Sequence, residues 1–469
     1  MVELNGTTAS RPYSPAKIQA RSQCDILHVP YTYFPDVVGG TEVYVASLVA
    51  ALRSHGIGGA VAAPGEAEAE YEYEQVPVYR FATDRNAGLA QAYGMPDAVA
   101  ARSFAALVAR RRPQIVHLHA RTAAVSERLA NIARRGGARV VLTYHTPTVS
   151  CARGTMMRLG RTPCDGRLDR RRCSSCALAN HGVPPLVRDA LAALPQALGE
   201  ALGRTGLAGP VLTALRLPSL IGAAHRQFHA LMQNVDRVVA PCNWVYEVLR
   251  RNGVPDEKLL LCRQGLACPP TRPSAAHWAD VEDGASRVAL RLGYFGRLDP
   301  TKGVDIVIEA LRRAPDLAVR LDIYGIRQLG GDAYATRLER IAGGDGRIEF
   351  QRAVAPEAVP EKMRNCDLVV VPSRWLETGP LVVLEAFAAR TPVLGARLGG
   401  IAELVTDGVD GVLVEPDSSA AWAAAIAALA GAPERVGRLR AGIRPPRTMQ
   451  DVARLMAGHY DTLLADAAA

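Results

Sequence analysis

Aromatic residues are scarce in this chain, at 5% of its 469 residues. A surface that binds single-stranded nucleic acid needs aromatic rings for base stacking, so this scarcity argues against nucleic acid as a partner. The chain also lacks an uncharged apolar run of about 18 residues, which a transmembrane helix would require. Residues 1–22 are polar and lack the apolar core of a secretion signal. The sequence therefore predicts a flexible N-terminus and a cytoplasmic location.

Cysteine occurs an odd number of times, nine in all. Without a secretion signal, an odd count favours a reducing compartment and argues against a disulfide framework. Acidic residues are fewer than basic ones, 46 against 55, which leaves a net charge of +9. With nucleic acid set aside, such a surplus suits an anionic membrane surface or a phosphorylated small molecule. The 49% of hydrophobic residues excludes a disordered or fibrous chain.

Short apolar runs alternate with longer helical stretches along most of the sequence. Several of these runs are continuous, such as 368–371 (LVVV), which is typical of strands buried on both faces of a parallel sheet. The alternation predicts α/β units with right-handed crossovers. The expected strands are 25–31, 59–64, 76–81, 114–119, 139–145, 237–241, 259–265, 288–298, 320–325, 348–351, 367–373, 392–396 and 411–415.

A stretch rich in Pro, Ser and acidic residues at 268–286 separates two sets of about six strands, and we interpret it as a linker. A chain of this length exceeds one usual domain. We therefore expect two Rossmann-like domains, 23–267 and 287–446, which face each other and hold a ligand between the carboxyl ends of their strands. Residues 447–469 contain one further helix, at 448–466.

Residues 151–234 do not follow the alternation and read as an insertion in the first domain. Their first part is rich in Arg and Cys. Their second part, 184–234, is rich in Ala and Leu and is interrupted by prolines, which predicts short helices. Two interpretations stay open: the insertion shapes a substrate pocket at the sheet edge, or it is a structural cap.

The sharpest pattern is 374–392, RWLETGPLVVLEAFAARTP. Glu377 falls in the loop after the strand 367–373, and Gly379 and Pro380 open a helix. Glu385 then lies one to two turns inside that helix. Free N–H groups and the positive dipole end at such a helix start suit a diphosphate. Either carboxylate taken alone could simply be solvated.

A second pattern, GYFGRLDPTKG at 293–303, places two cations just after a strand. Arg297 and Lys302 would fall at the same sheet edge as Glu377, where they could clamp a diphosphate. Each could also be an ordinary surface charge. Their shared position with an anion-binding helix start favours the clamp.

The first domain has its own candidates at strand ends. Gly39 and Gly40, in FPDVVGGT, fall at a strand-to-helix turn, where glycines let the backbone approach a phosphate or merely make a tight turn. His145, in TYHT, ends a strand, where its imidazole could assist the movement of a proton or simply pack against its neighbours. His117 reads as a packed strand residue, and His119 is a weak site candidate.

In the order and spacing of GRLDPTKG and ETGPLVVLEAFAARTPVLGARLGGIAELV, the chain resembles a retaining GT-B glycosyltransferase. The family is the large one, glycosyltransferase family 4-like, that contains sucrose synthases and bacterial mannosyltransferases. The resemblance runs from about residue 25 to the C-terminus. It implies two facing Rossmann-like domains with a parallel sheet each and a deep cleft between them. It also implies that the helix in 447–469 crosses back to the N-terminal domain.

The resemblance implies roles for the residues above. Arg297 and Lys302 would hold the diphosphate of a UDP- or GDP-sugar, Glu385 the ribose hydroxyls, and Glu377 hydroxyls of the donor sugar. The backbone around Gly379, Pro380 and Leu381, and Gly39 and Gly40 across the cleft, would meet the donor, with His145 beside the reacting sugar.

The resemblance further implies a metal-independent transfer with retention, to a saccharide, a lipid-linked acceptor or a small molecule. Two departures from the family pattern put contacts in doubt: Arg352 stands where a Gly is usual, and Gln264 begins the stretch QGLA where Asn-Gly-x-Asp is usual. A non-catalytic scaffold that binds a nucleotide-sugar or a partner glycosyltransferase stays open as an alternative, as does a phosphorylase or synthase on the same fold.

Two further clusters bear on partners. Cys151, Cys164, Cys173 and Cys176 lie within 26 residues, and Cys173-x2-Cys176 resembles half a zinc site. A structural zinc ion and reduced free cysteines both stay open. The arginine runs 110–112 and 170–172 could be solvated, or could support peripheral contact with the inner face of a membrane.

Overall fold

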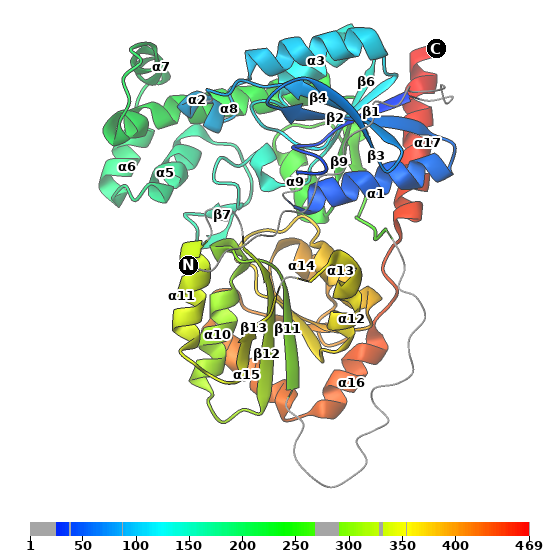
Figure 1. Cartoon of the computed structure of the whole chain (residues 1–469). Helices are drawn as coiled ribbons and strands as arrows, with labels where there is room; N and C mark the ends of the chain where they lie inside the picture. The colour runs from blue at the N-terminus through cyan, green and yellow to red at the C-terminus, as the bar shows by residue number, and fades with distance from the viewer. Residues whose placement is uncertain are drawn as a thin grey trace, which may run out of the picture.

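The computed structural model describes residues 25–36, 39–86, 88–267, 290–327, 332–352 and 354–468. The predicted flexible N-terminus, 1–22, and the predicted linker, 268–286, lie outside the described residues. Two α/β domains stand one above the other in Figure 1, each built around its own sheet. This confirms the predicted fold class of two Rossmann-like domains.

The first sheet has eight strands in the order β10-β9-β6-β5-β1-β2-β4-β3. All neighbours pair in parallel except β3 with β4. The sequence analysis did not predict β3, whose alternating AEYEY suits a solvent-exposed antiparallel edge. The strands are β1 (Asp25–Val29), β2 (Gly58–Gly65), β3 (Ala69–Tyr73), β4 (Val76–Ala82), β5 (Ile115–Leu118), β6 (Arg139–Thr143), β9 (Arg237–Ala240) and β10 (Leu259–Leu261).

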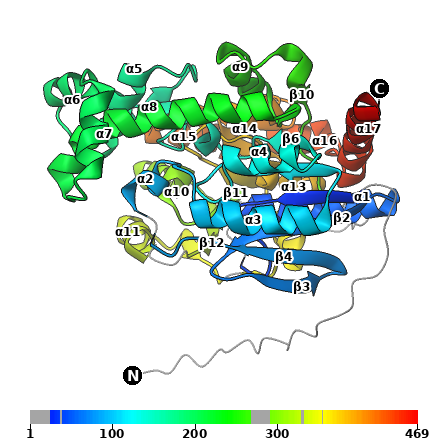
Figure 2. The same ribbon diagram turned by 90° about the horizontal axis from the view of Figure 1, so that it is seen from above.

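Helices cover both faces of this sheet because alternate strand residues point to opposite sides. Ile26 enters the core beneath α1 and α17, whereas Leu27 enters the core beneath α3, α4, α8 and α9. Figure 2 shows these layers from above. The elements are α1 (Gly40–Ser54), α2 (Leu89–Ala92), α3 (Ala98–Arg111), α4 (Glu127–Arg135), α8 (Pro210–Asn234), α9 (Asn243–Arg251), η2 (Asp256–Lys258) and α17 (Met449–Ala468).

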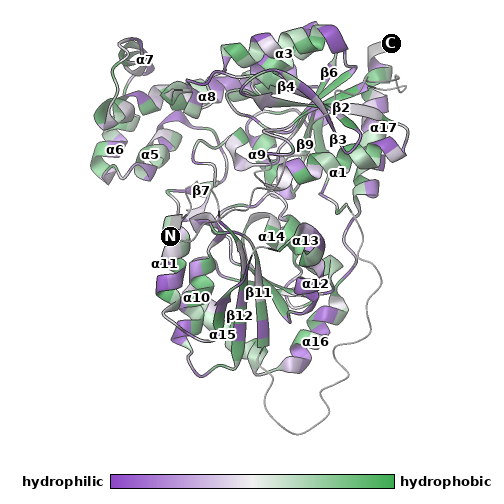
Figure 3. Cartoon of the chain, in the orientation of Figure 1, coloured by the Kyte–Doolittle hydropathy of each residue, from purple (hydrophilic) through white to green (hydrophobic). Residues whose placement is uncertain are grey.

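The second sheet is fully parallel, in the order β13-β12-β11-β14-β15-β16. Strands β14, β15 and β16 are buried on both faces, as the continuous runs predict. Strands β12 and β13 also carry exposed polar residues, and β12 shows purple bands in Figure 3. The strands are β11 (Leu290–Arg297), β12 (Val319–Ile326), β13 (Ile348–Phe350), β14 (Leu368–Val371), β15 (Val393–Ala396) and β16 (Gly411–Val414). The helices are η3 (Pro300–Lys302), α10 (Val304–Arg313), α11 (Asp332–Ala342), η4 (Pro356–Ala358), α12 (Val359–Arg364), α13 (Leu381–Ala388), α14 (Gly399–Leu404), α15 (Ser419–Ala430) and α16 (Pro433–Gly442).

The insertion contains a two-stranded hairpin and a group of helices that projects to one side of the first domain in Figures 1 and 2. It follows η1 (Pro147–Val149) and contains β7 (Met157–Arg158), β8 (Thr162–Pro163), α5 (Arg170–Asn180), α6 (Pro185–Ala192), α7 (Gln196–Arg204) and α8. The prediction of short helices holds for α6 and α7 but is wrong for α8, which runs 25 residues with Pro218 inside. Phe228, Leu231 and Met232 pack α8 into the domain core, and this packing offsets the cost of the proline.

The last helix, α17, follows the second domain in sequence but packs on the first. It lies beside α1, and Met449, Met456 and Tyr460 enter the core beneath α1. Leu266 fixes the crossing point: its N–H donates to Arg447 O at 3.0 Å, and its carbonyl accepts from Met449 N at 2.7 Å. The chain therefore passes between the two domains twice.

Candidate functional site

The order of strands reverses once in each sheet, between β1 and β5 in the first and between β11 and β14 in the second. Loops that follow such neighbouring parallel strands diverge and leave a crevice, which is where open α/β sheets bind ligands. Gly39 and Gly40 follow β1, Arg297 ends β11, and Lys302 ends η3 directly after it. Glu377 lies in the loop between β14 and α13. The predicted residues thus lie at the reversal points of the two sheets.

The Glu377 carboxylate is the most highly bonded group of this region. It is 6% exposed, and its Oε1 accepts from Nζ of Lys302 at 2.6 Å, Oγ of Ser373 at 2.8 Å and Nε1 of Trp375 at 2.8 Å. Nζ of Lys302 also lies 5.3 Å from the centre of the Trp375 ring, in cation–π range. Lys302 and Glu377 were predicted from the sequence, whereas Ser373 and Trp375 were not, although Trp375 lies within the pattern 374–392.

The backbone around Glu377 is held by groups from both domains. Its carbonyl accepts from Gly400 N at 2.7 Å and from Nε1 of Trp244, on α9 of the first domain, at 2.9 Å. The preceding Leu376 N–H donates to the carbonyl of Thr155, in the insertion, at 3.1 Å. No pattern in the sequence marked Trp244 or Thr155, because their importance depends on how the domains pack.

His145 meets the Glu377 loop across the domain boundary. Its carbonyl accepts from Oγ1 of Thr378 at 2.6 Å, and both residues are buried. The predicted first-domain residue and the predicted second-domain loop are therefore in direct contact.

Two helix N-termini face each other between the domains. A Cβ on Gly40, the first residue of α1, would lie 3.3 Å from Cδ1 of Leu381, the first residue of α13. Each helix start carries N–H groups without intrahelical partners and the positive end of a dipole. At α1 one such donor, the N–H of Gly39, is capped by Oε2 of Glu42 at 2.9 Å.

Glu42 and Arg297 bring opposite charges near one another from the two domains. Burial raises the pKa of Glu42, while backbone hydrogen bonds and the positive charge of Arg297 act in the opposite direction. Among the described residues, the Arg297 guanidinium has no hydrogen bond or ion pair, so its donors are available to a ligand. The sequence analysis predicted Arg297 but not Glu42.

Glu385 is one turn inside α13, as its place in the sequence predicts. Burial raises the pKa of its carboxyl group. Within the described ranges, its side chain has no hydrogen-bond donor or cation beside it. A carboxylate in this position can accept hydrogen bonds from a ligand's hydroxyl groups.

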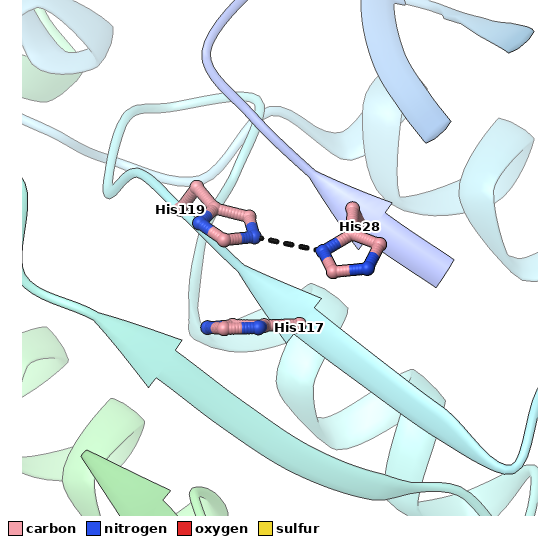
Figure 4. Close-up of side chains that lie close together, drawn as sticks. All are labelled: His28, His117 and His119. Atoms are coloured by element: carbon pink, nitrogen blue, oxygen red, sulfur yellow. Dashed lines mark hydrogen bonds between the residues drawn. The ribbon is translucent and has the colours of Figure 1, made fainter. Parts of the chain in front are cut away.

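His145 is hydrogen-bonded to a chain of buried histidines in the first domain. Nε2 of His145 lies 3.1 Å from Nδ1 of His119, and Nε2 of His119 lies 3.0 Å from Nδ1 of His28. Figure 4 shows the second of these contacts, between His28 on β1 and His119, the residue after β5. Burial lowers the pKa of His145 and of His28 to about 3, so both rings are neutral near pH 7. Since Nε2 of His145 is engaged, Nδ1 is the nitrogen left for a ligand.

Ring nitrogens of His28, His117 and His119 lie within 4.8 Å of one another, which raises the question of a metal ion. Nδ1 of His117 is hydrogen-bonded to the hydroxyl of Tyr460, and its Nε2 to Oγ1 of Thr143, both at 2.7 Å. These contacts and the histidine chain account for five of the six ring nitrogens of the cluster, and Nε2 of His28 is buried without a hydrogen-bond partner among the described residues. His117 is thus a packed strand residue.

Gln264, one of the departures from the family pattern, contacts the loop that carries Glu377. A Cβ on Gly379 would lie 3.2 Å from Cδ of Gln264. The Oε1 atom of Gln264 is buried and has no hydrogen-bond partner among the described residues. The four predicted metal-ligating cysteines lie away from this site, around a cavity of the insertion.

Comparisons with known protein families match both domains. A family described as "Glycosyl transferase 4-like domain" matches residues 39–265, and one described as "Glycosyl transferases group 1" matches residues 289–431. The two ranges together span more than three quarters of the chain.

Among curated proteins, a D-inositol 3-phosphate glycosyltransferase from Nocardia farcinica is 31% identical over 217 residues, 45% of this chain and 48% of that protein. D-inositol 3-phosphate glycosyltransferase 1 from Catenulispora acidiphila is 34% identical over 249 residues, 51% of this chain and 57% of that protein. The chain thus spans about half the length of the curated relatives it matches.

Solved structures resemble the fold over nearly the whole chain. Sucrose-phosphate synthase from Thermosynechococcus elongatus has a TM-score of 0.65 at 18% identity, with 95% of this chain and 100% of that chain covered. The Anabaena protein HepE in complex with UDP has a TM-score of 0.60 at 18% identity, with 93% and 100% covered. At such low identity these likenesses establish the two-domain fold.

Proposed function

The chain belongs to the group 1 family of glycosyl transferases, and from this premise we propose that it transfers a sugar from a nucleotide-sugar donor to an acceptor. The observation that carries the proposal is the Lys302–Glu377 ion pair, which lies in the loops beside two facing helix N-termini. A nucleoside diphosphate needs fixed positive charge, and a sugar needs hydroxyl-binding carboxylates. This region supplies both.

The donor's diphosphate is bound by Arg297, Lys302 and the N–H groups at the start of α13. As the bond to the sugar breaks, negative charge grows on the diphosphate, and these fixed groups stabilise it without a metal ion. The transition state at the sugar is oxocarbenium-like, as in glycoside hydrolysis. The leaving diphosphate accepts the acceptor's proton, and the acceptor attacks from the same face, which retains the anomeric configuration.

Glu377 binds hydroxyl groups of the donor sugar and does not act as a nucleophile. Its Oε1 already has three donors, which hold the carboxylate in place and reduce its availability for bond formation. Glu385 accepts hydrogen bonds from the ribose. His145, neutral and with Nδ1 available, hydrogen-bonds the donor sugar on the first-domain side.

The donor is a UDP- or GDP-sugar. UDP and UDP-glucose are bound in solved structures of HepE, which shares the fold, and this supports a nucleotide-sugar without identifying the base for this chain. The acceptor is a saccharide, a lipid-linked saccharide or a small molecule. D-inositol 3-phosphate is the acceptor that the relatives' names indicate, and it belongs in the test panel.

Binding and turnover test this proposal separately. Calorimetric titration with UDP, GDP and ADP is expected to give micromolar affinity for one of them. Incubation of labelled nucleotide-sugars with the acceptors is expected to give EDTA-insensitive transfer, and NMR of the product should show the donor's anomeric configuration. Failure of every nucleoside diphosphate to bind would contradict the proposal. Tight binding without turnover on any acceptor would instead identify a non-catalytic scaffold.

A lipid-linked acceptor would require the protein to contact a membrane. Within the described ranges, no helix has the length and apolar character needed to span a bilayer. In the arginine runs, Arg110 pairs with Glu70, Arg111 with Asp25. In the second run, Arg172 pairs with Asp165, and Arg170 donates to the carbonyl of Leu194. Among the described residues, Arg112 and Arg171 have no such partner and are available to an anionic surface. Co-flotation with vesicles of anionic lipid supports a lipid-linked acceptor, and its absence favours a soluble one.

A further inference from the structure

The insertion contains a cavity that the glycosyl-transfer site does not use. Cys151 reaches it from the loop after η1, Cys164 from the residue after β8, and Cys173 and Cys176 from α5. All four are partly buried and have free thiols. Cys173 and Cys176 are three residues apart on a helix, so their side chains share one face. Four thiols from three separate segments therefore converge on one space.

We propose that Cys151, Cys164, Cys173 and Cys176 bind one structural zinc ion that ties the insertion to the donor-binding loop. Four cysteine thiolates are a ligand set that closes the tetrahedral coordination of structural zinc. The ion displaces the thiol protons when it binds and undergoes no redox change.

Polar hydrogens already point at these sulfur atoms. Sγ of Cys176 accepts from Leu159 N at 3.2 Å, and Sγ of Cys164 accepts from Nη2 of Arg172 at 3.3 Å. A neutral thiol is a weak acceptor, whereas a metal-bound thiolate takes such donors as its second shell of contacts.

The charge around the cavity also suits a tetrathiolate site. Zinc with four thiolates carries a net charge of −2, which a buried position must compensate. The cavity is lined by Arg153, Arg158, Arg167 and Arg172. Without thiolates, these cations would surround a set of neutral thiols.

Binding requires the segments to close around the ion. Zinc–sulfur bonds of about 2.3 Å place tetrahedral sulfur atoms about 3.8 Å apart. No three of the four Sγ atoms lie within 4.8 Å of one another in the part of the chain that the structure describes. The segments that must move are a loop, a hairpin of two-residue strands and the start of α5, which have few backbone pairings to break.

The cavity is connected directly to the donor-binding loop. Met156 and Met157, between the first two cysteines, are 2% exposed and pack in the core of the second domain. Between Cys151 and Met156, the carbonyl of Thr155 accepts the N–H of Leu376, the residue before Glu377. An ion that fixes Cys151 therefore also fixes one side of the loop that carries Glu377.

Metal analysis of the full chain tests the site without reference to turnover. Protein purified without immobilised metal or chelator, and reloaded with zinc under reducing conditions, is expected to contain about one zinc ion per chain. The double variant C173S/C176S is expected to lose it, whereas C268S, the matched control outside the insertion, is expected to keep it. Less than about a tenth of an equivalent in the reloaded wild type overturns the proposal, as does iron in place of zinc or equal zinc in both variants.

Hydrogen exchange tests the connection to the donor loop. Zinc is expected to slow exchange of the Leu376 amide at least several-fold in the wild type and to leave it unchanged in C173S/C176S. Equal exchange with and without bound zinc overturns the coupling. The zinc site itself does not depend on the proposed function. Only the role of the Glu377 loop in donor binding rests on it. Failure of nucleoside diphosphates to bind zinc-loaded protein would count against glycosyl transfer, whereas zinc content and amide exchange would still decide the metal site.

Discussion

Lys302 and Arg297, the two predicted cations, have different surroundings in the structure. Lys302 is paired with the buried Glu377 at 2.6 Å and lies over the Trp375 ring, whereas Arg297 faces Glu42 from across the domain boundary. Lys302 is therefore fixed in place before a ligand arrives. Arg297 is anchored only by its strand and can follow the ligand.

Replacing Lys302 by Met is expected to lower kcat/KM for the nucleotide-sugar by about 10²–10³-fold. The substitution removes a fixed charge where negative charge grows and leaves the buried Glu377 with two neutral donors. Steady-state kinetics measure the loss, and circular dichroism checks the fold. K362M, on α12, is the matched control and is expected to keep wild-type activity. Equal activity in both variants would contradict the assigned role.

The buried histidines predict that the protein loses stability on acidification. Burial lowers the pKa of His28 and His145 from 6.5 to about 3, so both rings stay neutral in the folded chain while the unfolded chain binds protons. Stability is therefore complete above about pH 6.5 and falls as the pH drops toward 3. The expected slope is about 1.4 kcal/mol per pH unit for each such histidine.

Denaturant unfolding between pH 7 and 4.5 measures this slope. H28N removes one of these two histidines. It is expected to reduce the slope by about 1.4 kcal/mol per pH unit, the contribution of one proton, although it also lowers stability at pH 7. H55N, on the exposed end of α1, is the control and should leave the slope unchanged. A free energy of unfolding that stays constant down to pH 5 would be inconsistent with neutral buried rings.

The positions of the proposed site residues could be predicted from the sequence where each depends on a single strand–loop–helix unit. Lys302, Glu377 and Glu385 have positions that follow from where a strand ends and a helix begins, because parallel strands put such ends at one edge. Trp244 and Thr155 were not predictable. They contact the Glu377 loop only because the first domain and its insertion pack there, and no local pattern encodes that packing.

At the scale of elements, the loop before α13 is shaped by the start of α14. Gly400 N donates to Glu377 O at 2.7 Å, and a Cβ on Gly400 would lie 2.7 Å from that same oxygen. Only a residue without a side chain allows this approach. The start of α14 therefore fixes the backbone position of Glu377.

Gly400→Ala is expected to displace the Glu377 loop and to lower kcat/KM on the order of 10²-fold, because positioning errors near 1 Å have effects of that size. Global stability should change much less, since the clash is confined to one loop. Gly458→Ala, inside α17 with open space around its Cβ, is the matched control. It is expected to keep full activity and to gain about 0.5–1 kcal/mol of stability. Retained activity in the Gly400 variant would contradict this account.

Periodicity predicted the strands and most helices, and it failed where packing outweighs local preference. Every predicted run overlaps an observed strand, because buried parallel strands have few other ways to place continuous apolar residues. The length of α8 was missed because Pro218 signals a helix end, yet packing against α5 and α7, with Leu217 and Ile221 buried beside it, keeps the helix continuous. The edge strand β3 was missed because Glu weakens a strand pattern.

At the scale of the whole molecule, α9 and α14 join the two domains. Glu403, on α14, accepts from the N–H groups of Asn243 and Trp244 at the start of α9, at 2.8 Å and 2.9 Å. It also pairs with Arg263 at 3.3 Å. A carboxylate at a helix start is favoured by the dipole, so this contact stabilises the closed arrangement.

Glu403→Gln is expected to loosen the contact between domains, since it removes the charge that faces the α9 start and Arg263. Small-angle scattering of the ligand-free variant should give a larger radius of gyration than that of the wild type, and saturating nucleoside diphosphate should reduce the difference. Glu357→Gln, an exposed residue on η4, is the control and should scatter as the wild type does. Identical profiles for all three proteins would show that Glu403 does not hold the domains together.

The position of α17 has a consequence for how the protein is made. Residues of α17 complete the core beneath α1, so the domain that is translated first lacks part of its interior until α17 has left the ribosome. Met456 and Tyr460 are synthesised only after the strands and helices of the second domain. A premature stop anywhere in the second half would therefore damage the first domain as well, and nascent chains would expose the α1 surface to chaperones throughout synthesis.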